Sequence, residues 1–270
     1  MIQTLAEGEP VLGVTSVDNH LYVLREKPPG EIEVYDIETY TFLRRLTVSE
    51  CGGVMSDMVG CGHNRCIYVS GASHVQRIEV PHGAITKWPV NDELGALSLT
   101  VTHNVLVTCY EVCKLKEFNS NGQLLREVVL PLDVCVPLHT VQLSRGELIV
   151  CHGDPDESLH RVCMIGSDGQ VVKSYGGSPG SVIQQMSLPV HMAVDGNDFV
   201  FVADSGNSRV LLMSPSLRFI REVVSPEKLQ ICPFRLSLDI QRRRLYVAVN
   251  EFSDGKNEGG RGMVIITHIE

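Results

Sequence analysis

Two histidines share a local pattern that could carry chemistry. They lie in Pro137-Leu138-His139 and Pro189-Val190-His191. An imidazole can move a proton near neutral pH or bind a metal ion. Arg235, if it lies beside them, would repel a cation and favour a carboxylate ligand. Two imidazoles alone hold zinc weakly, so the sequence favours histidines that hydrogen-bond to the backbone or to water over histidines that bind a metal.

Other candidate sites are weaker. The stretch Cys61-Gly62-His63-Asn64-Arg65-Cys66 has the look of a metal knuckle, but it falls in a hairpin turn and no second ligand pair follows. The acidic run 154–157 lacks the glycine and the final glutamate of a calcium-binding loop. The nine cysteines are scattered and odd in number, which indicates reduced thiols. We therefore expect no resident cofactor.

The elements that position these residues repeat along the chain. A short apolar strand recurs as Leu21-Tyr22-Val23, Ile67-Tyr68-Val69, Val105-Leu106-Val107, Leu148-Ile149-Val150, Val200-Phe201-Val202 and Leu245-Tyr246-Val247. The spacing is about 45 residues, which is typical of propeller blades. Each unit shows β-branched or alternating runs separated by turn residues. The pattern predicts an all-β, six-bladed propeller with four antiparallel strands in each blade.

The last unit lacks its outer strand. The segment Ile2 to Leu5 precedes the first unit and resembles the outer strands of the others. We expect it to complete the sixth blade, because such closure removes two exposed sheet edges. No linker divides the chain, so residues 1–270 are predicted to form one domain. Only Ile183 to Met186 and Pro226 to Leu229 are expected to form a helical turn.

One unit carries a more specific signature. The matching residues, in order, are Gly176-Gly177, Pro189, Val194-Asp195, Val202-Ala203-Asp204 and Asn207-Ser208-Arg209-Val210. This segment closely resembles an NHL repeat, while the other five units keep only the strand pattern. The chain is similar to the C-terminal propellers of RING-type NHL ubiquitin ligases, but it has no RING, B-box or coiled coil, so ligase activity is not implied. Asp204 is expected to accept from turn amides and Arg209 to pair back with a carboxylate.

The start of each first strand should surround the central channel of a propeller. Aligning the units places there Leu12, Ser56, Ser98, His139, His191 and Arg235. Peptidyl-amidoglycolate lyases resemble NHL propellers and hold a metal with three channel histidines, whereas this chain offers two. Calcium-dependent lactonase propellers are only faintly resembled, through Gly8-Glu9-Pro10. A divergent lyase-like or lactonase-like enzyme using His139, His191 and Arg235 is therefore an alternative function.

Charge separates the remaining functions. The chain has 270 residues with 23 Lys and Arg against 32 Asp and Glu, a formal net charge of −9. Acidic residues also prevail on the loops that join second to third strands, the face where some NHL propellers bind RNA. Such a surface disfavours single-stranded RNA, which remains a minority alternative. No apolar run is long enough to span a membrane, and the amino terminus resembles no secretory signal, which favours the cytoplasm.

These observations favour a non-catalytic, monomeric binding scaffold. Its partner is expected to be a protein or a basic peptide that binds the acidic loop face. The longest loops should set specificity, since rigid sheets hold variable loops in place. The predicted contact residues are Asp154, Asp156, Glu157, Glu251, Asp254 and Glu258.

Overall fold

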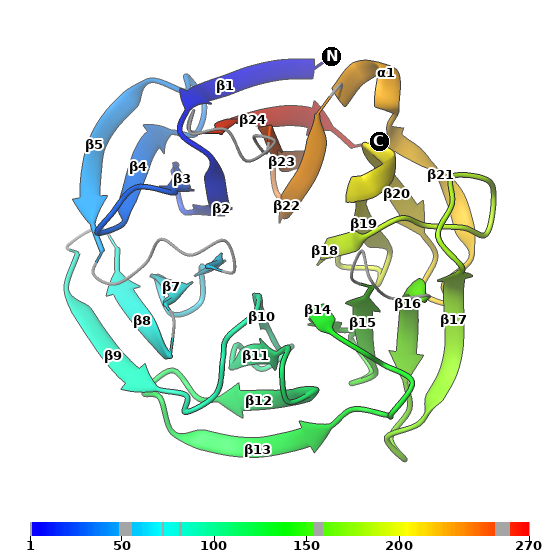
Figure 1. Ribbon diagram of the computed structural model, residues 1–270. Helices are drawn as coiled ribbons and strands as arrows, with labels where there is room; N and C mark the ends of the chain where they lie inside the picture. The colour runs from blue at the N-terminus through cyan, green and yellow to red at the C-terminus, as the bar shows by residue number, and fades with distance from the viewer. Residues whose placement is uncertain are drawn as a thin grey trace.

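Six four-stranded antiparallel sheets stand around one central axis (Figure 1). The computed structural model describes residues 2–48, 56–71, 73–80, 83–153, 159–229, 231–251 and 260–269. Blade 1 consists of β2 (Val11–Val17), β3 (His20–Arg25), β4 (Glu31–Asp36) and β5 (Phe42–Thr47). Blade 2 consists of β6 (Met58–Cys61), β7 (Cys66–Ser70), β8 (His74–Glu79) and β9 (Ile85–Pro89). Blade 3 consists of β10 (Leu97–Leu99), β11 (Val105–Cys109), β12 (Lys114–Phe118) and β13 (Leu124–Val129).

The other half of the ring repeats this order. Blade 4 consists of β14 (Pro137–Gln142), β15 (Leu148–His152), β16 (His160–Ile165) and β17 (Val171–Gly177). Blade 5 consists of β18 (Pro189–Val194), β19 (Val200–Asp204), β20 (Arg209–Met213) and β21 (Phe219–Val224). Blade 6 consists of β22 (Cys232–Asp239), β23 (Arg244–Glu251), β24 (Arg261–His268) and β1 (Ile2–Gly8). The predicted propeller is thus confirmed.

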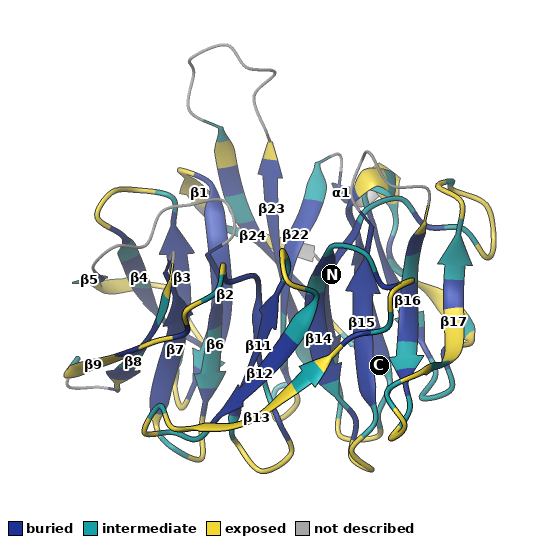
Figure 2. Ribbon diagram, turned by 60° about the horizontal axis from the view of Figure 1, so that its bottom comes forward, coloured by how far each residue is buried: buried dark blue, intermediate teal, exposed yellow. Residues whose placement is uncertain are grey.

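Burial explains the repeated sequence pattern. The second strands β7, β11, β15 and β19 are buried at every position, because both of their faces pack against neighbouring blades. Tyr22, Tyr68 and Tyr246 occupy the same place in their blades and are fully buried. The outer strands β5 and β13 are exposed along most of their length (Figure 2). The recurring apolar triplet is therefore the packing core of each blade.

The ring closes as the sequence predicts. β1 pairs antiparallel with β24, and the register runs from Ile2 opposite Thr267 to Gly8 opposite Gly262. Leu5 packs against the core cluster shared by blades 1 and 6. The Asn250 side chain adds two bonds across the seam, since its Oδ1 accepts from Val11 N at 2.8 Å and its Nδ2 donates to Val11 O at 2.9 Å.

Helices are minor among the described residues. The predicted turn at Pro226–Leu229 is the short helix α1. Ile183 to Met186 forms only an irregular turn, so that part of the helical prediction was wrong. A 3-10 turn covers Ser205–Asn207. Among the described residues, none of these helical segments is long and apolar enough to cross a membrane.

The turn of blade 5 that carries the repeat signature is held by one buried carboxylate. Asp204 Oδ1 accepts from Ser187 N at 2.7 Å, while Oδ2 accepts from Asn207 Nδ2 at 2.8 Å and Arg209 Nε at 2.7 Å. Arg209 then donates to the carbonyl oxygens of Ser181 and Gln185. The predicted pairing of Arg209 with a carboxylate is confirmed, whereas Asp204 accepts from the backbone of the preceding loop and from the Asn207 side chain rather than from the backbone amides of its own turn.

We expect Asp204→Ala to lower the free energy of unfolding by about 3 kcal/mol, because it leaves buried donors without an acceptor. The control is Glu222→Ala, since Glu222 also pairs with Arg209 but its side chain is 36% exposed. That variant should lose less than about 1 kcal/mol. Urea unfolding of both proteins decides the matter, and equal losses would contradict the role of Asp204.

Candidate functional site

One residue of each blade occupies the equivalent position at the start of the first, innermost strand. The alignment of the six repeat units in the sequence identified three of these six residues incorrectly. Four inner strands contain a β-bulge near their start, at Leu12, Leu138, Val190 and Phe234. In these four strands the residue after the bulge is Gly13, His139, His191 or Arg235. In blades 2 and 3 the residues that pair with the same position of the second strand are Asp57 and Ala96. The predicted Leu12, Ser56 and Ser98 are one or two residues away from these positions.

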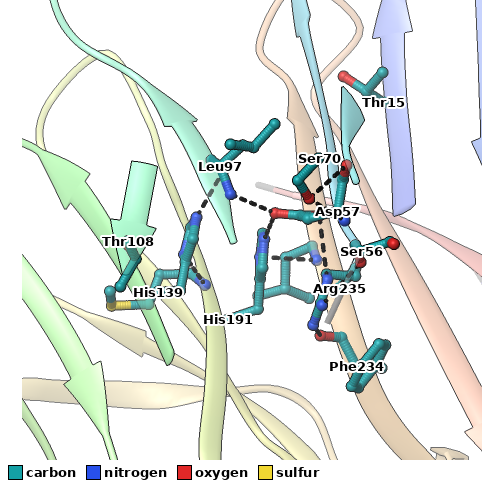
Figure 3. A network of polar contacts seen from close by, with 12 residues as sticks. Thr15, Ser56, Asp57, Ser70, Leu97, Thr108, His139, His191, Phe234 and Arg235 are labelled. Atoms are coloured by element: carbon teal, nitrogen blue, oxygen red, sulfur yellow. Dashed lines mark hydrogen bonds and ion pairs between the residues drawn. The ribbon is translucent and has the colours of Figure 1, made fainter. Parts of the chain in front are cut away.

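Asp57 is the residue that the sequence analysis missed. It precedes β6, is 1% exposed, and lies at the centre of the polar network in Figure 3. Its Oδ2 accepts from Leu97 N at 2.9 Å and lies 3.3 Å from His191 Nε2. Its Oδ1 lies 3.1 Å from Arg235 Nε in an ion pair. One carboxylate therefore connects blade 2 with blades 3, 5 and 6.

The structure brings His139, His191 and Arg235 together as the sequence predicts. The two imidazole rings stack with centroids 3.8 Å apart and an interplanar angle of 11° (Figure 3). Arg235 donates to the Ser56 carbonyl oxygen at 3.2 Å, and its guanidinium lies 3.9 Å from the centroid of the Phe234 ring. All three side chains are buried.

The hydrogen bonds of the two histidines fix their protons. His139 Nδ1 accepts from Met192 N at 3.0 Å, and His191 Nδ1 accepts from Leu236 N at 3.2 Å. A neutral imidazole that accepts at Nδ1 carries its proton on Nε2. His139 Nε2 therefore donates to Leu97 O at 3.1 Å, and His191 Nε2 donates to Asp57. His139 thus links blade 4 to blades 3 and 5, and His191 links blade 5 to blade 6 and, across the channel, to blade 2, so that neither ring keeps a free nitrogen.

Electrostatics agree with this assignment of protons. Burial lowers the pKa of His139 well below its ordinary value, and the adjacent His191 lowers it further. Burial also lowers the pKa of His191, against the opposing pull of Asp57. Burial alone would raise the pKa of Asp57, but His191 and Arg235 outweigh it and hold that pKa well below its ordinary range. At neutral pH the cluster contains one anion, one cation and two neutral rings.

The donor set does not fit a divalent cation. One ligand atom from each of Asp57, His139 and His191 lies within 4.8 Å of the others. A metal ion needs a deprotonated nitrogen lone pair, whereas both Nε2 atoms carry protons and both Nδ1 atoms accept from the backbone. Arg235 beside Asp57 would also repel the ion. For the same reason neither imidazole is available as a general base.

The cysteine-rich hairpin contains buried thiols. Cys61 and Cys66 lie opposite each other in the β6–β7 pair and are 1% and 0% exposed. His63, in the turn between these two cysteines, stacks on His103 of the next blade, with ring centroids 4.3 Å apart. Within the described part of the chain, Cys61, Cys66, Cys109, Cys113, Cys151, Cys163 and Cys232 form no disulfide. This agrees with the reading of reduced thiols.

The predicted loop-face contacts are placed only in part. Asp154, Asp156, Glu157, Asp254 and Glu258 lie outside the described residues. Glu251 ends β23 and is exposed. It lines a hollow of about 600 Å³ at the seam between blades 6 and 1. Glu7 and Glu9, both exposed, line the same hollow, together with Arg261.

The electrostatics of this seam are acidic. Arg25, next to the hollow, is 3% exposed and is occupied by Glu33 at 2.9 Å and the Glu9 carbonyl oxygen at 2.7 Å. Burial raises the pKa of Glu26, and the charge of Glu9 raises it further. Glu9 and Glu26 therefore repel one another, and a cation near them would relieve that repulsion.

Protonation of the buried histidines should destabilise the fold. The folded pKa values of His139 and His191 lie below the ordinary value of about 6.5, so between these limits the unfolded chain binds more protons. Stability is therefore full above about pH 6.5 and falls as the pH is lowered, by about 1.4 kcal/mol per pH unit for each histidine. Urea unfolding between pH 7.5 and 5 measures this slope.

The control for the slope is His139→Gln, in which the amide group does not titrate. The slope below pH 6.5 should then decrease by about one proton. An unchanged slope would show that other groups cause the acid sensitivity.

Comparison with known proteins identifies the fold. The sequence matches no family model and no curated protein. A streptogramin B lyase structure is similar with a TM-score of 0.66 at 10% identity, over 100% of this chain and 87% of that chain. A catalytically inactive virginiamycin B lyase from Staphylococcus aureus, with quinupristin, gives 0.65 at 11% identity over 98% of both chains. The β-propeller domain of Myceliophteria thermophila Cps50 (Swd1) gives 0.63 at 10% identity over 100% of both. At these identities the likeness shows the fold alone.

Proposed function

We propose that this propeller is a non-catalytic scaffold that binds a protein or a basic peptide on its acidic loop face. The observation that carries the proposal is the seam hollow, where Glu7, Glu9 and Glu251 gather around one depression. Arg25 lies beneath it but is already bound to Glu33 and to backbone oxygens. Among the described residues that line the hollow, three exposed carboxylates thus face one exposed cationic side chain, Arg261.

A basic side chain suits this hollow for a physical reason. A lysine or arginine of a partner would lie among the exposed carboxylates of Glu7, Glu9 and Glu251. Charge complementarity of this kind speeds association and selects partners, and it weakens as salt screens the charges. Asp154, Asp156, Glu157, Asp254 and Glu258, which the sequence predicts as contacts, remain part of the same proposal. Single-stranded RNA is disfavoured because its phosphates would meet these carboxylates.

The propeller type is part of the proposal. The chain is proposed to be an NHL-type propeller, with the Asp204, Asn207 and Arg209 turn as its one complete repeat signature. The alternative function is a divergent enzyme that uses His139, His191 and Arg235. The similarity in fold to lyase structures is the reason to consider it. The protons on both Nε2 atoms weigh against it, because neither ring offers a base.

The test compares two double variants of the complete chain. Glu9→Gln/Glu251→Gln removes two charges from the hollow, and Glu147→Gln/Asp168→Asn removes two from hairpin turns on the opposite face. The probe is a fluorescent nine-residue polyarginine peptide, measured by anisotropy at 50 and 200 mM NaCl. The wild-type protein and the opposite-face variant should bind alike, more weakly at high salt. The seam variant should bind about tenfold more weakly.

Equal binding by all three proteins would overturn the proposal. Elemental analysis of the purified protein addresses the enzyme alternative separately, because a tightly bound stoichiometric metal would favour that function. Filter binding of random single-stranded RNA addresses the RNA alternative, and a steep salt dependence would favour it.

A further inference from the structure

Another hollow lies in the channel, on the face opposite the seam. It has a volume of about 570 Å³ and ends at the stacked rings of His139 and His191 (Figure 3). All six inner strands contribute to its wall, mainly with the apolar residues Val14, Val59, Leu99, Val141, Val194 and Leu238. Its mouth lies among the turns that join first to second strands, where Val101 and Ile240 line it and are 51% and 55% exposed. The structure describes every segment that frames it, namely residues 14–17, 58–66, 97–105, 137–148, 189–200 and 236–244.

Two carboxylates line this cavity at its mouth. Asp195 and Asp198 belong to the turn that follows β18, and both are half-buried. Within the described part of the chain neither forms an ion pair, whereas Asp18, in the corresponding turn of blade 1, pairs with Arg65 at 3.4 Å. The described residues that line the cavity include no lysine and no arginine. The mouth therefore has two negative charges that no guanidinium or ammonium group of the described chain balances.

The hydrogen bonds of these carboxylates leave room for a further donor. Asp195 accepts from the backbone N–H groups of Asn197 and Phe199, both at 2.9 Å, and both bonds go to its Oδ1. Its Oδ2 accepts from no described donor. Asp198 accepts from the backbone N–H of Ser144 through Oδ1 and from the hydroxyl of the same residue through Oδ2. Since a carboxylate has about four lone-pair sites, both side chains can still accept from an ammonium group.

The charged groups around the cavity leave the mouth negative and the floor neutral. At the floor, Asp57 pairs with Arg235, and burial keeps both imidazoles neutral. At the rim, Arg145 follows Ser144 in the chain but lines a separate hollow. His103 lines the cavity, and its ring stacks on another histidine. A positive group is therefore favoured at the mouth, and apolar groups are favoured deeper in the channel.

We infer that this cavity binds a primary amine with an apolar body. The ammonium group lies beside Asp195 and Asp198 and donates charge-assisted hydrogen bonds to them, while the apolar body lies against the inner strands. The volume is within the range of ordinary ligand sites, which are mostly apolar and have a few polar groups that fix orientation. The carboxylates repel an anion, and a neutral molecule gains no charge-assisted bond from them. The site lies on the face opposite the seam hollow and does not depend on the function proposed for that hollow.

Four probes test the inference on the complete chain: 2-naphthylmethylammonium, methylammonium, 2-acetylnaphthalene and 2-naphthoate. The first has both the positive charge and the apolar body. The second lacks the body, the third lacks the charge, and the fourth has the opposite charge. Ligand-observed NMR titration at pH 7.5 should show saturable binding of 2-naphthylmethylammonium. The other three probes should bind at least about tenfold more weakly, because each loses either the charge-assisted hydrogen bonds or the apolar contact.

The variant Asp195→Asn/Asp198→Asn removes the charges and keeps the turn. An asparagine Oδ1 still accepts from the same backbone N–H groups, and asparagine tolerates the φ of 66° found at Asp198. This variant should bind the amine about tenfold more weakly and the neutral ketone as the wild type does. The matched control is Asp36→Asn/Asp168→Asn. These two aspartates also accept from amides of their own turns, but the turns join third to fourth strands, away from the channel, so amine binding should not change.

The position of the site has its own control. The seam variant Glu9→Gln/Glu251→Gln should bind the amine as the wild type does, and a tenfold loss there would place the site at the seam and overturn the inference. The inference is also overturned if 2-naphthylmethylammonium shows no saturable binding, or if it binds no more tightly than the ketone or methylammonium. Equal binding of the amine by the channel variant and its matched control would overturn it as well.

Discussion

Deleting residues 1–8 should open the ring and lower the free energy of unfolding by at least about 4 kcal/mol. The deletion removes the strand that pairs with β24 at five registered positions, and each main-chain hydrogen bond contributes about 1 kcal/mol net. It also uncovers the core cluster against which Leu5 packs. The exposed edge of β24 would then be free to pair with another molecule. Urea unfolding together with size-exclusion chromatography measures both effects.

Rescue separates ring closure from other consequences of shortening the chain. A synthetic peptide of residues 1–9, added to the truncated protein, should restore stability in a concentration-dependent way. Within the intact chain, Leu5→Ser should be destabilising and Gln3→Ser nearly neutral, because Gln3 is exposed. An unfolding midpoint that does not change on deletion would show that the clasp is not needed.

Much of this fold could be predicted because the repeat is local. The triplets around Tyr22, Tyr68 and Tyr246 are apolar since the second strand of every blade is buried on both faces. The Pro-x-His pattern also placed His139 and His191 correctly, because both follow the same β-bulge in adjacent blades. These features depend on residues within one blade, so a single sequence displays them.

Asp57 could not be found in the same way. Its partners Leu97 and His191 are 40 and 134 residues away along the chain, and no sequence pattern near Asp57 predicts these contacts. Alignment by strand spacing also missed it by one position, since β6 starts without the bulge seen in β14 and β18. The sequence also could not predict which ring nitrogen of each histidine carries the proton. The position of the proton depends on the backbone N–H groups of Met192 and Leu236, each of which belongs to the blade after that of the histidine it contacts.

Replacing Asp57 by asparagine should lower the free energy of unfolding by about 3–5 kcal/mol. The substitution leaves Arg235, which is 5% exposed, as a buried cation without an anion, and this is among the most destabilising changes that a single residue can make. Because the pKa of Asp57 lies far below neutrality, the deficit should be constant from pH 6 to 8. Urea unfolding across that range measures it.

A double-mutant cycle shows whether the unpaired charge is the cause. Arg235→Met removes the cation, so Asp57→Asn/Arg235→Met should be clearly more stable than the sum of the single losses requires. The matched control is Asp239→Asn, since Asp239 is 7% exposed but its partner Arg242 reaches solvent. That variant should lose no more than about 1 kcal/mol. If Asp57→Asn were as mild as the control, the buried ion pair with Arg235 would not contribute to holding the blades together.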